Sequence, residues 1–210
     1  NTIIDCEGVR RGLLGDGCGD NGTVIEGVTF TNGHAETGGG IQLADCAASF
    51  TDCVIDNNRA TLFGQVPPVG GGGIFLSGSS STFTGCTISN NIADDDGGGA
   101  CVRYSSPTFT NCVFENNAAE DGGGLHSGNP TGFNGDDTTT LIDCTFTDNE
   151  AVASGGGTNF AWEFSSADVQ NCTFTYNSAL RGGGIYLYNS NANLNGSTFE
   201  SNHATESGGG

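Results

Sequence analysis

Cysteine is the residue type whose spacing first suggests chemistry in this chain of 210 residues, which contains nine of them. Five cysteines begin a recurring phrase, Cys-x-Phe or Cys-x-Ile, and they are Cys53, Cys86, Cys112, Cys144 and Cys172. If the phrases stack, these side chains form a column with neighbours one strand spacing apart. A row of disulfides would need the side chains to turn out of register, whereas a small apolar side chain suits a tight corner of a core. We therefore expect a structural core ladder, and the missing Cys-x-x-Cys pairs disfavour a metal site.

Four cysteines lie outside this column, and three of them carry an expectation. Cys6 and Cys18 flank an amino-terminal loop and make the best candidate for a disulfide. Because nine is odd, at least one thiol is free or pairs with another chain. Cys101 is expected to point outward from its strand.

Acidic residues gather in the segment that precedes each glycine triplet, and the densest examples are Asp94, Asp95, Asp96, Glu120 and Asp121. Stacked copies would bring these carboxylates into one acidic ridge. Such a ridge could take up calcium through carboxylate and carbonyl oxygens, although the sequence requires no cofactor. The alternative is a solvated edge that keeps the protein soluble and discourages lateral pairing of sheets.

A polysaccharide lyase or hydrolase would need acidic groups that converge with a basic one on an exposed face. The sequence offers four such groups outside the acidic ridge: Asp143, Asp168, Arg103 and Arg181. Aligned on the repeat, they are not expected to converge, and the outward face of the strand after the glycines is expected to carry no acid. Catalysis is therefore the second hypothesis.

Two side-chain patterns suggest a binding surface. Aromatic residues lie on or near the strand that follows the glycines, and they are Phe75, Tyr104, Trp162, Tyr186 and Tyr188. An exposed aromatic strip would favour contact with glycans or proteins, while the alternative is local packing of inserted loops. Thr-x-Thr pairs such as Thr82 and Thr84 resemble those of ice-binding β-solenoids, but other residue types interrupt the pattern in later copies.

The elements that must position these residues are given by a repeat of about 25 residues or more. The phrase CTFTYNSALRGGGIYL begins at Cys172, and related phrases begin at Val28, Cys53, Cys86, Cys112, Cys144 and Ser197. Each copy contains three short runs in which apolar and polar residues alternate, which is typical of strands. No single copy can bury its apolar face alone, so the copies must stack.

The sequence therefore predicts an all-β parallel β-helix, a three-sheet β-solenoid with about seven coils. Residues 1–22 are expected to form a strand and a loop leading into it, and residues 23–210 the repeats, with an incomplete last copy. Asparagines are expected to close the third strand of each coil, adopting left-handed backbone geometry and bonding to the copies above and below. They are Asn58, Asn91, Asn117, Asn149, Asn177 and Asn202. The glycine triplets are expected where side chains would clash with stacked coils.

Composition limits the partners. The formal charge of −19, with five arginines and no lysine, disfavours nucleic acid because little is available to neutralise phosphates. No apolar run reaches the roughly 20 residues needed to span a bilayer.

The combination of Phe-x-x-Asn, as at Phe114 to Asn117, with a glycine pair followed by Leu, as at Gly123 to Leu125, resembles the repeats of chlamydial polymorphic outer-membrane proteins. More broadly, it is similar to right-handed β-helix surface proteins of the pectin-lyase-like class. The resemblance implies right-handed coiling, secretion, and a surface or adhesive role.

We therefore expect a non-catalytic structural or adhesive rod, outside the cell or on its surface. Its partners are expected to be further copies joined end to end into a fibre, and host or matrix glycans or proteins. The alternatives are a polysaccharide lyase or glycoside hydrolase, and an ice- or glycan-binding surface.

Overall fold

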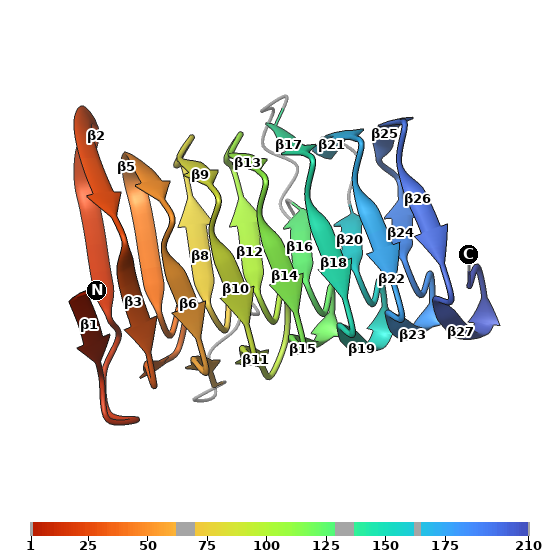
Figure 1. Ribbon diagram of the computed structural model, residues 1–210, viewed down its shortest axis with the longest axis horizontal. Helices are drawn as coiled ribbons and strands as arrows, with labels where there is room; N and C mark the ends of the chain where they lie inside the picture. The colour runs from red at the N-terminus through yellow and green to blue at the C-terminus, as the bar shows by residue number, and fades with distance from the viewer. Residues whose placement is uncertain (1, 62–69, 129–136, 162–164, 210) are drawn as a thin grey trace.

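The computed structural model describes the chain except residues 1, 62–69, 129–136, 162–164 and 210. The described residues form strands and no helix, and every strand pairing is parallel. The strands stack along one axis, from the red first coil to the blue last coil (Figure 1). The predicted all-β parallel solenoid is confirmed.

Three sheets run along the stack. Sheet A consists of β1 (Thr2–Asp5), β3 (Val28–Thr31), β6 (Val54–Asp56), β10 (Thr87–Ser89), β14 (Val113–Glu115), β18 (Thr145–Thr147), β22 (Thr173–Thr175) and β26 (Thr198–Glu200). Sheet C consists of β4 (His34–Ala35), β7 (Arg59–Ala60), β11 (Ile92–Ala93), β15 (Ala118–Asp121), β19 (Glu150–Ser154), β23 (Ser178–Arg181) and β27 (His203–Ser207).

Sheet B is the largest and has two arms. The first arm follows the glycines and contains β8 (Ile74–Ser77), β12 (Ala100–Arg103), β16 (Leu125–Gly128), β20 (Thr158–Ala161) and β24 (Ile185–Tyr188). The second arm contains β9 (Thr82–Thr84), β13 (Thr108–Thr110), β17 (Asp137–Ile142), β21 (Ser165–Gln170) and β25 (Asn191–Asn195). The long strand β5 (Ile41–Thr51) pairs with both arms, and β2 (Leu13–Glu26) pairs with β5.

Two expectations about these elements are wrong. The first and second runs form one sheet joined through β5, and the third sheet comes from the short strands of sheet C, where a loop was expected. At the amino terminus, residues 7–22 were expected to be a loop, but β2 runs through Leu13–Glu26 and pairs in register with β5. With β1 in place, sheet A has eight strands rather than about seven. The strand β2 was not predicted because it is rich in glycine and because its pairing partner, β5, lies in the next coil.

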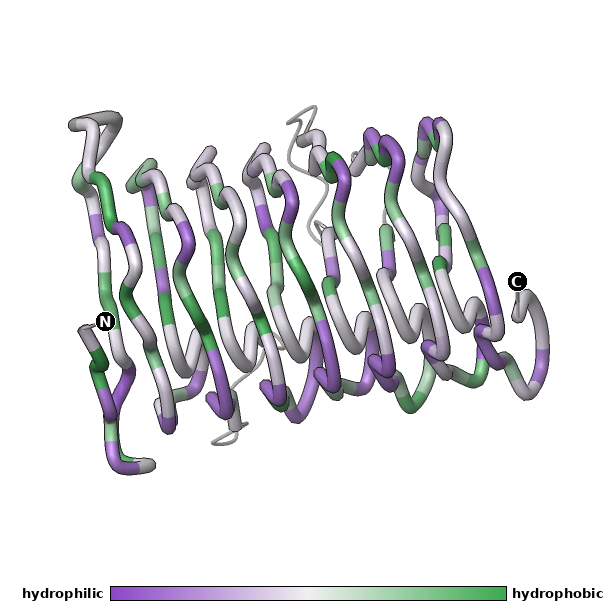
Figure 2. The backbone as a smooth tube through the Cα atoms, viewed as in Figure 1, coloured by the Kyte–Doolittle hydropathy of each residue, from purple (hydrophilic) through white to green (hydrophobic). Residues whose placement is uncertain are grey.

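The core is a set of matched layers. The second arm stacks Phe50, Phe83 and Phe109 with ring centroids 4.8 Å apart. A second stack on sheet A joins Phe114, Phe146, Phe174 and Phe199 at 4.6–4.8 Å. Figure 2 shows hydrophobic residues along the strands and hydrophilic ones at the corners. Because each ring lies on the ring of the next coil, the coils are held in one register.

The predicted cysteine ladder is confirmed. Cys53, Cys86, Cys112, Cys144 and Cys172 are free thiols, each with an exposed fraction of 1%. Each thiol donates to a carbonyl two residues earlier, as Cys112 does to Thr110 at 3.4 Å. The column therefore fills a corner of the core.

The asparagine ladder is also present, with one correction. In each inner copy the side-chain amide bonds to the next copy and to a carbonyl of the preceding coil; Asn117 Nδ2 donates to Asn149 Oδ1 at 2.9 Å and to the Ile88 carbonyl at 2.9 Å. The left-handed residue is the one before, as at Asn116 (φ 54°) and Asp148 (φ 53°). The asparagine amide is buried, and the exposed residue before it makes the turn.

The glycine triplets meet both requirements expected of them. The first glycine has a positive φ, as at Gly122 (66°), where a side chain would strain the backbone. The third lies against the next coil, and a Cβ on Gly124 would be 2.5 Å from the Gly157 carbonyl oxygen. Stacking at this corner therefore excludes side chains.

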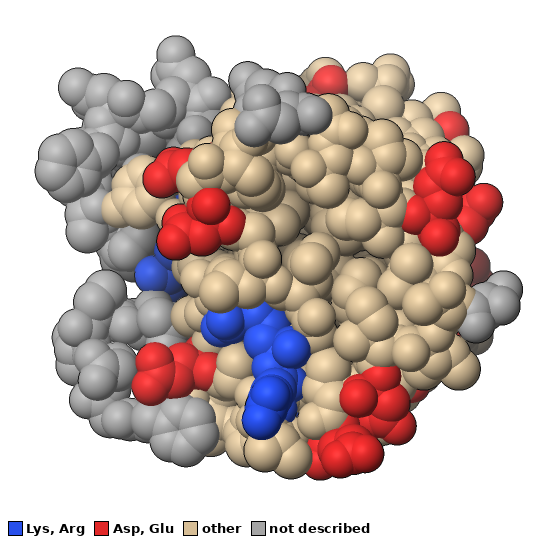
Figure 3. All heavy atoms as spheres, turned by 90° about the vertical axis from the view of Figure 1, so that its left-hand side faces the viewer, with Lys and Arg blue, Asp and Glu red and all other residues tan. Residues whose placement is uncertain are grey.

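Charged side chains are visible on the end of the solenoid that carries the first coil. Most of the acidic groups in this view lie near the edge, and a compact group of basic side chains lies nearer the middle of the face (Figure 3). No helix in the described ranges is long and apolar enough to cross a membrane.

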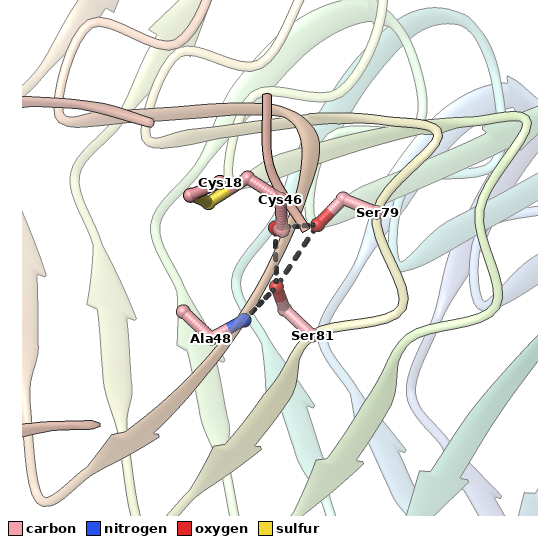
Figure 4. The surroundings of a disulfide bond; sticks show 5 residues. All are labelled: Cys18, Cys46, Ala48, Ser79 and Ser81. Carbon is pink, nitrogen blue, oxygen red and sulfur yellow. Dashed lines mark hydrogen bonds between the residues drawn. A yellow bond between two sulfur atoms is a disulfide. The ribbon is translucent and has the colours of Figure 1, made fainter. Parts of the chain in front are cut away.

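The disulfide differs from the expected one. Cys18 pairs with Cys46, with Cα atoms 4.6 Å apart, and Cys6 is a free thiol. The pairing of Cys6 with Cys18 was wrong because β2 carries Cys18 alongside β5, where Cys46 lies. Ser79 of the next coil donates to the Cys46 carbonyl at 2.6 Å, and Ser81 accepts from the Ala48 amide at 3.0 Å (Figure 4). The bond joins the first coil to the second.

Candidate functional site

The outward face of the first arm of sheet B is covered rather than exposed. Phe75, Cys101, His126 and Asn159 occupy equivalent outward positions, and each has an exposed fraction of 9% or less. Cys101 points outward from its strand, as expected, but its thiol is buried rather than exposed to solvent. Burial raises the pKa of its thiol to about 12, which makes it unreactive as a nucleophile near neutral pH.

Acidic side chains reach this face from the corner before the glycines. Asp96 Oδ2 accepts from Arg103 Nη2 at 3.0 Å, and its Oδ1 lies 3.6 Å from His126 Nδ1. Asp96 and Asp121 also form a parallel backbone bridge between adjacent coils. No acid was expected on this face, so the approach of Asp96 to Arg103 and His126 differs from the expectation. The glycines reverse the chain so closely that the residues before them fold over the strand after them.

Two of these carboxyls have perturbed acidity. Burial, reinforced by the charges of Asp96, Glu120 and Asp121, raises the pKa of Asp95 to about 7, although Arg103 opposes the shift. Burial also raises the pKa of Asp121, with Asp96 adding to the effect. Near neutral pH, Asp95 therefore holds a proton in a substantial fraction of molecules, and a half-protonated carboxyl beside other charges is typical of a functional site.

These carboxyls line a hollow of about 320 Å³. Its lining comes from four successive coils and consists of Asp95, Asp96, Asp121, His126, Ser154, Asn159, Ala161, Arg181, Tyr186 and Tyr188. The volume is at the lower end of the range for small-molecule sites, about 300–1,000 Å³.

Several buried polar atoms in the hollow have no hydrogen-bond partner within the described part of the chain. They are Asp95 Oδ2, Asp121 Oδ1, His126 Nδ1 and Asn159 Oδ1. His126 and Asn159 have exposed fractions of only 4% and 3%. An unsatisfied buried polar atom costs about 1–3 kcal/mol, so this group of atoms is an expensive arrangement unless a ligand or solvent completes it.

The aromatic residues that the sequence suggested as one binding strip lie at different places in the structure. Tyr186 and Tyr188 line the hollow, and Tyr188 is 48% exposed. Phe75 is only 9% exposed, so it is not part of an exposed strip. Tyr104 occupies a left-handed corner with φ 49°, and Trp162 lies outside the described residues. A tyrosine pair therefore replaces the expected strip.

The acidic residues that were expected to form one ridge line two separate depressions. Asp95, Asp96 and Asp121 face the hollow, whereas Asp94 and Glu120 line a separate depression beside Val152. Among the described residues, no three His, Cys, Asp or Glu side chains are placed to hold a metal ion. The calcium hypothesis therefore gains no support from side-chain geometry.

The other acidic candidates lie elsewhere. Asp143 occupies a left-handed corner with φ 52°, and Asp168 bonds to Gln170 and Asn193 on the second arm. Arg181 stands at the rim of the hollow and pairs with Glu206 at 3.2 Å. Sequence reasoning missed Asn159 and Ser154, and the signal that could have found them is their position on either side of a glycine triplet, like Asp121 and His126.

Stacked parallel strands in three sheets define the class of this protein as a parallel β-helix. The model of the right-handed beta helix region matches residues 1–163 and also residues 39–210, so the chain belongs to the right-handed β-helix family. No curated protein and no solved structure matches the chain. The fold occurs in both enzymes and non-enzymes, and the likeness to chlamydial repeats stays an expectation.

Proposed function

We propose that this β-helix is a glycan-binding rod whose binding site is the hollow on the first arm of sheet B. The observation that carries the proposal is the group of buried, unpartnered polar atoms beside two tyrosines. The proposal keeps the adhesive role and the extracellular or cell-surface placement expected from the sequence.

The chemistry of the hollow suits a sugar. Asp95 Oδ2, Asp121 Oδ1 and Asn159 Oδ1 are acceptors that lack a donor in the described chain, and sugar hydroxyls are donors. Tyr186 and Tyr188 supply flat apolar faces with a polar tip, which suit ligands that are apolar on one side and polar on the other. The lining crosses four coils, so an extended chain of sugars could lie along the stack.

The binding test compares two tyrosines. Wild-type protein is titrated with a panel of oligosaccharides, neutral, acidic and basic, by calorimetry. Tyr186→Ala should weaken binding about tenfold or more, the scale expected of an aromatic anchor. The control is Tyr176→Asn, because Tyr176 is 61% exposed at a sheet A corner where other coils carry asparagine. Unchanged binding by Tyr186→Ala, or no binding of any oligosaccharide, would overturn the proposal.

A second candidate is glycoside hydrolysis at the same hollow. The observation that favours it is Asp95, whose raised pKa of about 7 leaves a proton to donate beside Asp96, which is paired with Arg103. A lyase acting on uronates is less favoured, because Arg103 is already engaged and the hollow is acidic. Release of reducing ends by wild-type protein, lost in Asp95→Asn, would establish hydrolysis; none from any bound oligosaccharide would reject it.

A further inference from the structure

The hollow contains an imbalance of charge that limits its ligand. Asp95, Asp96 and Asp121 contribute three carboxyls, and Glu120 adds its field from the neighbouring strand position. The basic group that opposes them at Asp95 is Arg103, and that guanidinium is engaged with Asp96 at 3.0 Å. Arg181 at the rim is engaged with Glu206. The carboxyls therefore outnumber the basic groups that could neutralise them.

Among the unpartnered side-chain atoms of residues that line the hollow, hydrogen-bond acceptors outnumber donors. Asp121 Oδ1 and Asn159 Oδ1 can accept but not donate, and Asp95 Oδ2 accepts once its carboxyl has lost its proton. His126 Nδ1 lies 3.6 Å from Asp96 Oδ1, which favours a proton on that nitrogen. A sugar hydroxyl offers one donor and leaves the charge uncompensated. A protonated amine offers three donors and one positive charge, so it can satisfy two or three acceptors together.

We propose that the ligand of the hollow is a cationic amino sugar, whose ammonium group binds between Asp95 and Asp121. This inference rests on the proposed glycan-binding function and names the substrate class of that site. Asn159 supports the assignment independently of the acidic cluster, because it is more than nine-tenths buried, lines the hollow, and has an Oδ1 without a hydrogen-bond partner in the described chain.

A cation would also offset the mutual repulsion of these carboxyls. The carboxyl of Asp95 faces Asp96, Glu120 and Asp121, with Arg103 as the opposing charge, and burial adds to its reluctance to ionise. An ammonium group would take the place of the proton and of the missing donors. The overall charge of −19 would further concentrate cationic ligands near the surface.

The test is a calorimetric comparison at pH 6 among oligosaccharides of equal length: glucosamine oligomers, their N-acetylated forms, and uronate oligomers. Glucosamine oligomers should bind about tenfold tighter than the acetylated ones, as expected for a charge-assisted hydrogen bond, and the difference should shrink in high salt. Asp121→Asn should remove the preference. The matched control, Asp148→Asn, makes the same charge change at a corner that does not line the hollow and should keep it.

The outcomes separate the two proposals. Equal or tighter binding of acetylated or uronate oligomers overturns the amino-sugar assignment but leaves glycan binding standing. No binding of any oligosaccharide overturns both. Binding of oligolysine but not of glucosamine oligomers also overturns both and indicates a basic protein partner.

Discussion

Asn149 is the most informative single residue of the stack, because its side chain joins three coils. Its Nδ2 donates to the Phe114 carbonyl and to Asn177 Oδ1, both at 2.9 Å. Its Oδ1 accepts from the backbone and the side chain of Asn117, at 3.1 and 2.9 Å. Replacement by alanine deletes all four bonds while the backbone amide keeps its bond to Asn177.

The expected cost follows from the groups left behind. In Asn149→Ala, the Phe114 carbonyl loses its side-chain donor, and the Asn117 amide and one Asn117 side-chain hydrogen lose their acceptor in a buried corner. At about 1–2 kcal/mol for each, the free energy of unfolding should fall by about 3–6 kcal/mol. Urea denaturation followed by circular dichroism measures the change, and an unchanged m value would show that the comparison is sound.

The control is the adjacent residue. Asp148 is exposed and left-handed, and asparagine occupies the equivalent corner at Asn90 and Asn116. Asp148→Asn should therefore change stability by no more than about 0.5 kcal/mol. A loss below about 1 kcal/mol in Asn149→Ala would refute the reasoning that the buried ladder, rather than the exposed turn, holds the corner.

Three further predictions follow from other parts of the molecule. The raised pKa of Asp95 means that the folded state binds more protons than the unfolded state between about pH 4 and 7, so wild-type stability should fall as pH rises through that range. Three units correspond to about 4 kcal/mol, reduced to about 1–2 kcal/mol because the carboxyl is only half-buried. Asp95→Asn should reduce the fall by this amount in urea titrations at pH 4.5 and 8, and the raised pKa of Asp121 should leave a smaller fall in the same direction. The Cys18–Cys46 disulfide closes a loop with a sequence separation of 28, so reduction should cost about 3–4 kcal/mol in wild-type protein and nothing in Cys46→Ser; equal losses would contradict its role. Finally, Leu194 is 45% exposed beside a hollow lined by Leu187 and Phe199, and we propose that this apolar surface contacts another copy of the chain. Sedimentation at high concentration should show association that Leu194→Glu abolishes, and a wild-type monomer would reject it.

The fold was predictable because its rules are local and repeated. Alternation of apolar residues around Phe114, Phe146 and Phe174 fixed which faces turn inward, and the glycines and asparagines between the runs fixed the corners. The strand β2 was missed because glycine and aspartate have low strand propensity. This segment becomes a strand through its pairing with β5. Propensity cannot reveal a strand that depends on its neighbour.

The hollow could not be assembled from the sequence for a different reason. The alternation of apolar and polar residues predicts whether Asp96 or His126 faces inward or outward. It does not predict how closely the residues before a glycine triplet approach the strand after it. The close approach of Asp96 to Arg103 depends on the reversal at Gly97, whose φ is 66°. The acids were recognised as a group and were assigned to a solvated ridge. Their burial emerges only when the corner geometry is known.

The most direct test of the central claim, that the hollow is a site for an amino sugar, is a crystal structure of the protein with a glucosamine oligomer. The account predicts a sugar ring against Tyr186, with its amine within hydrogen-bond distance of the Asp95 or Asp121 carboxylate. An oligomer bound on another face, or a hollow without sugar at saturating concentration, would contradict it.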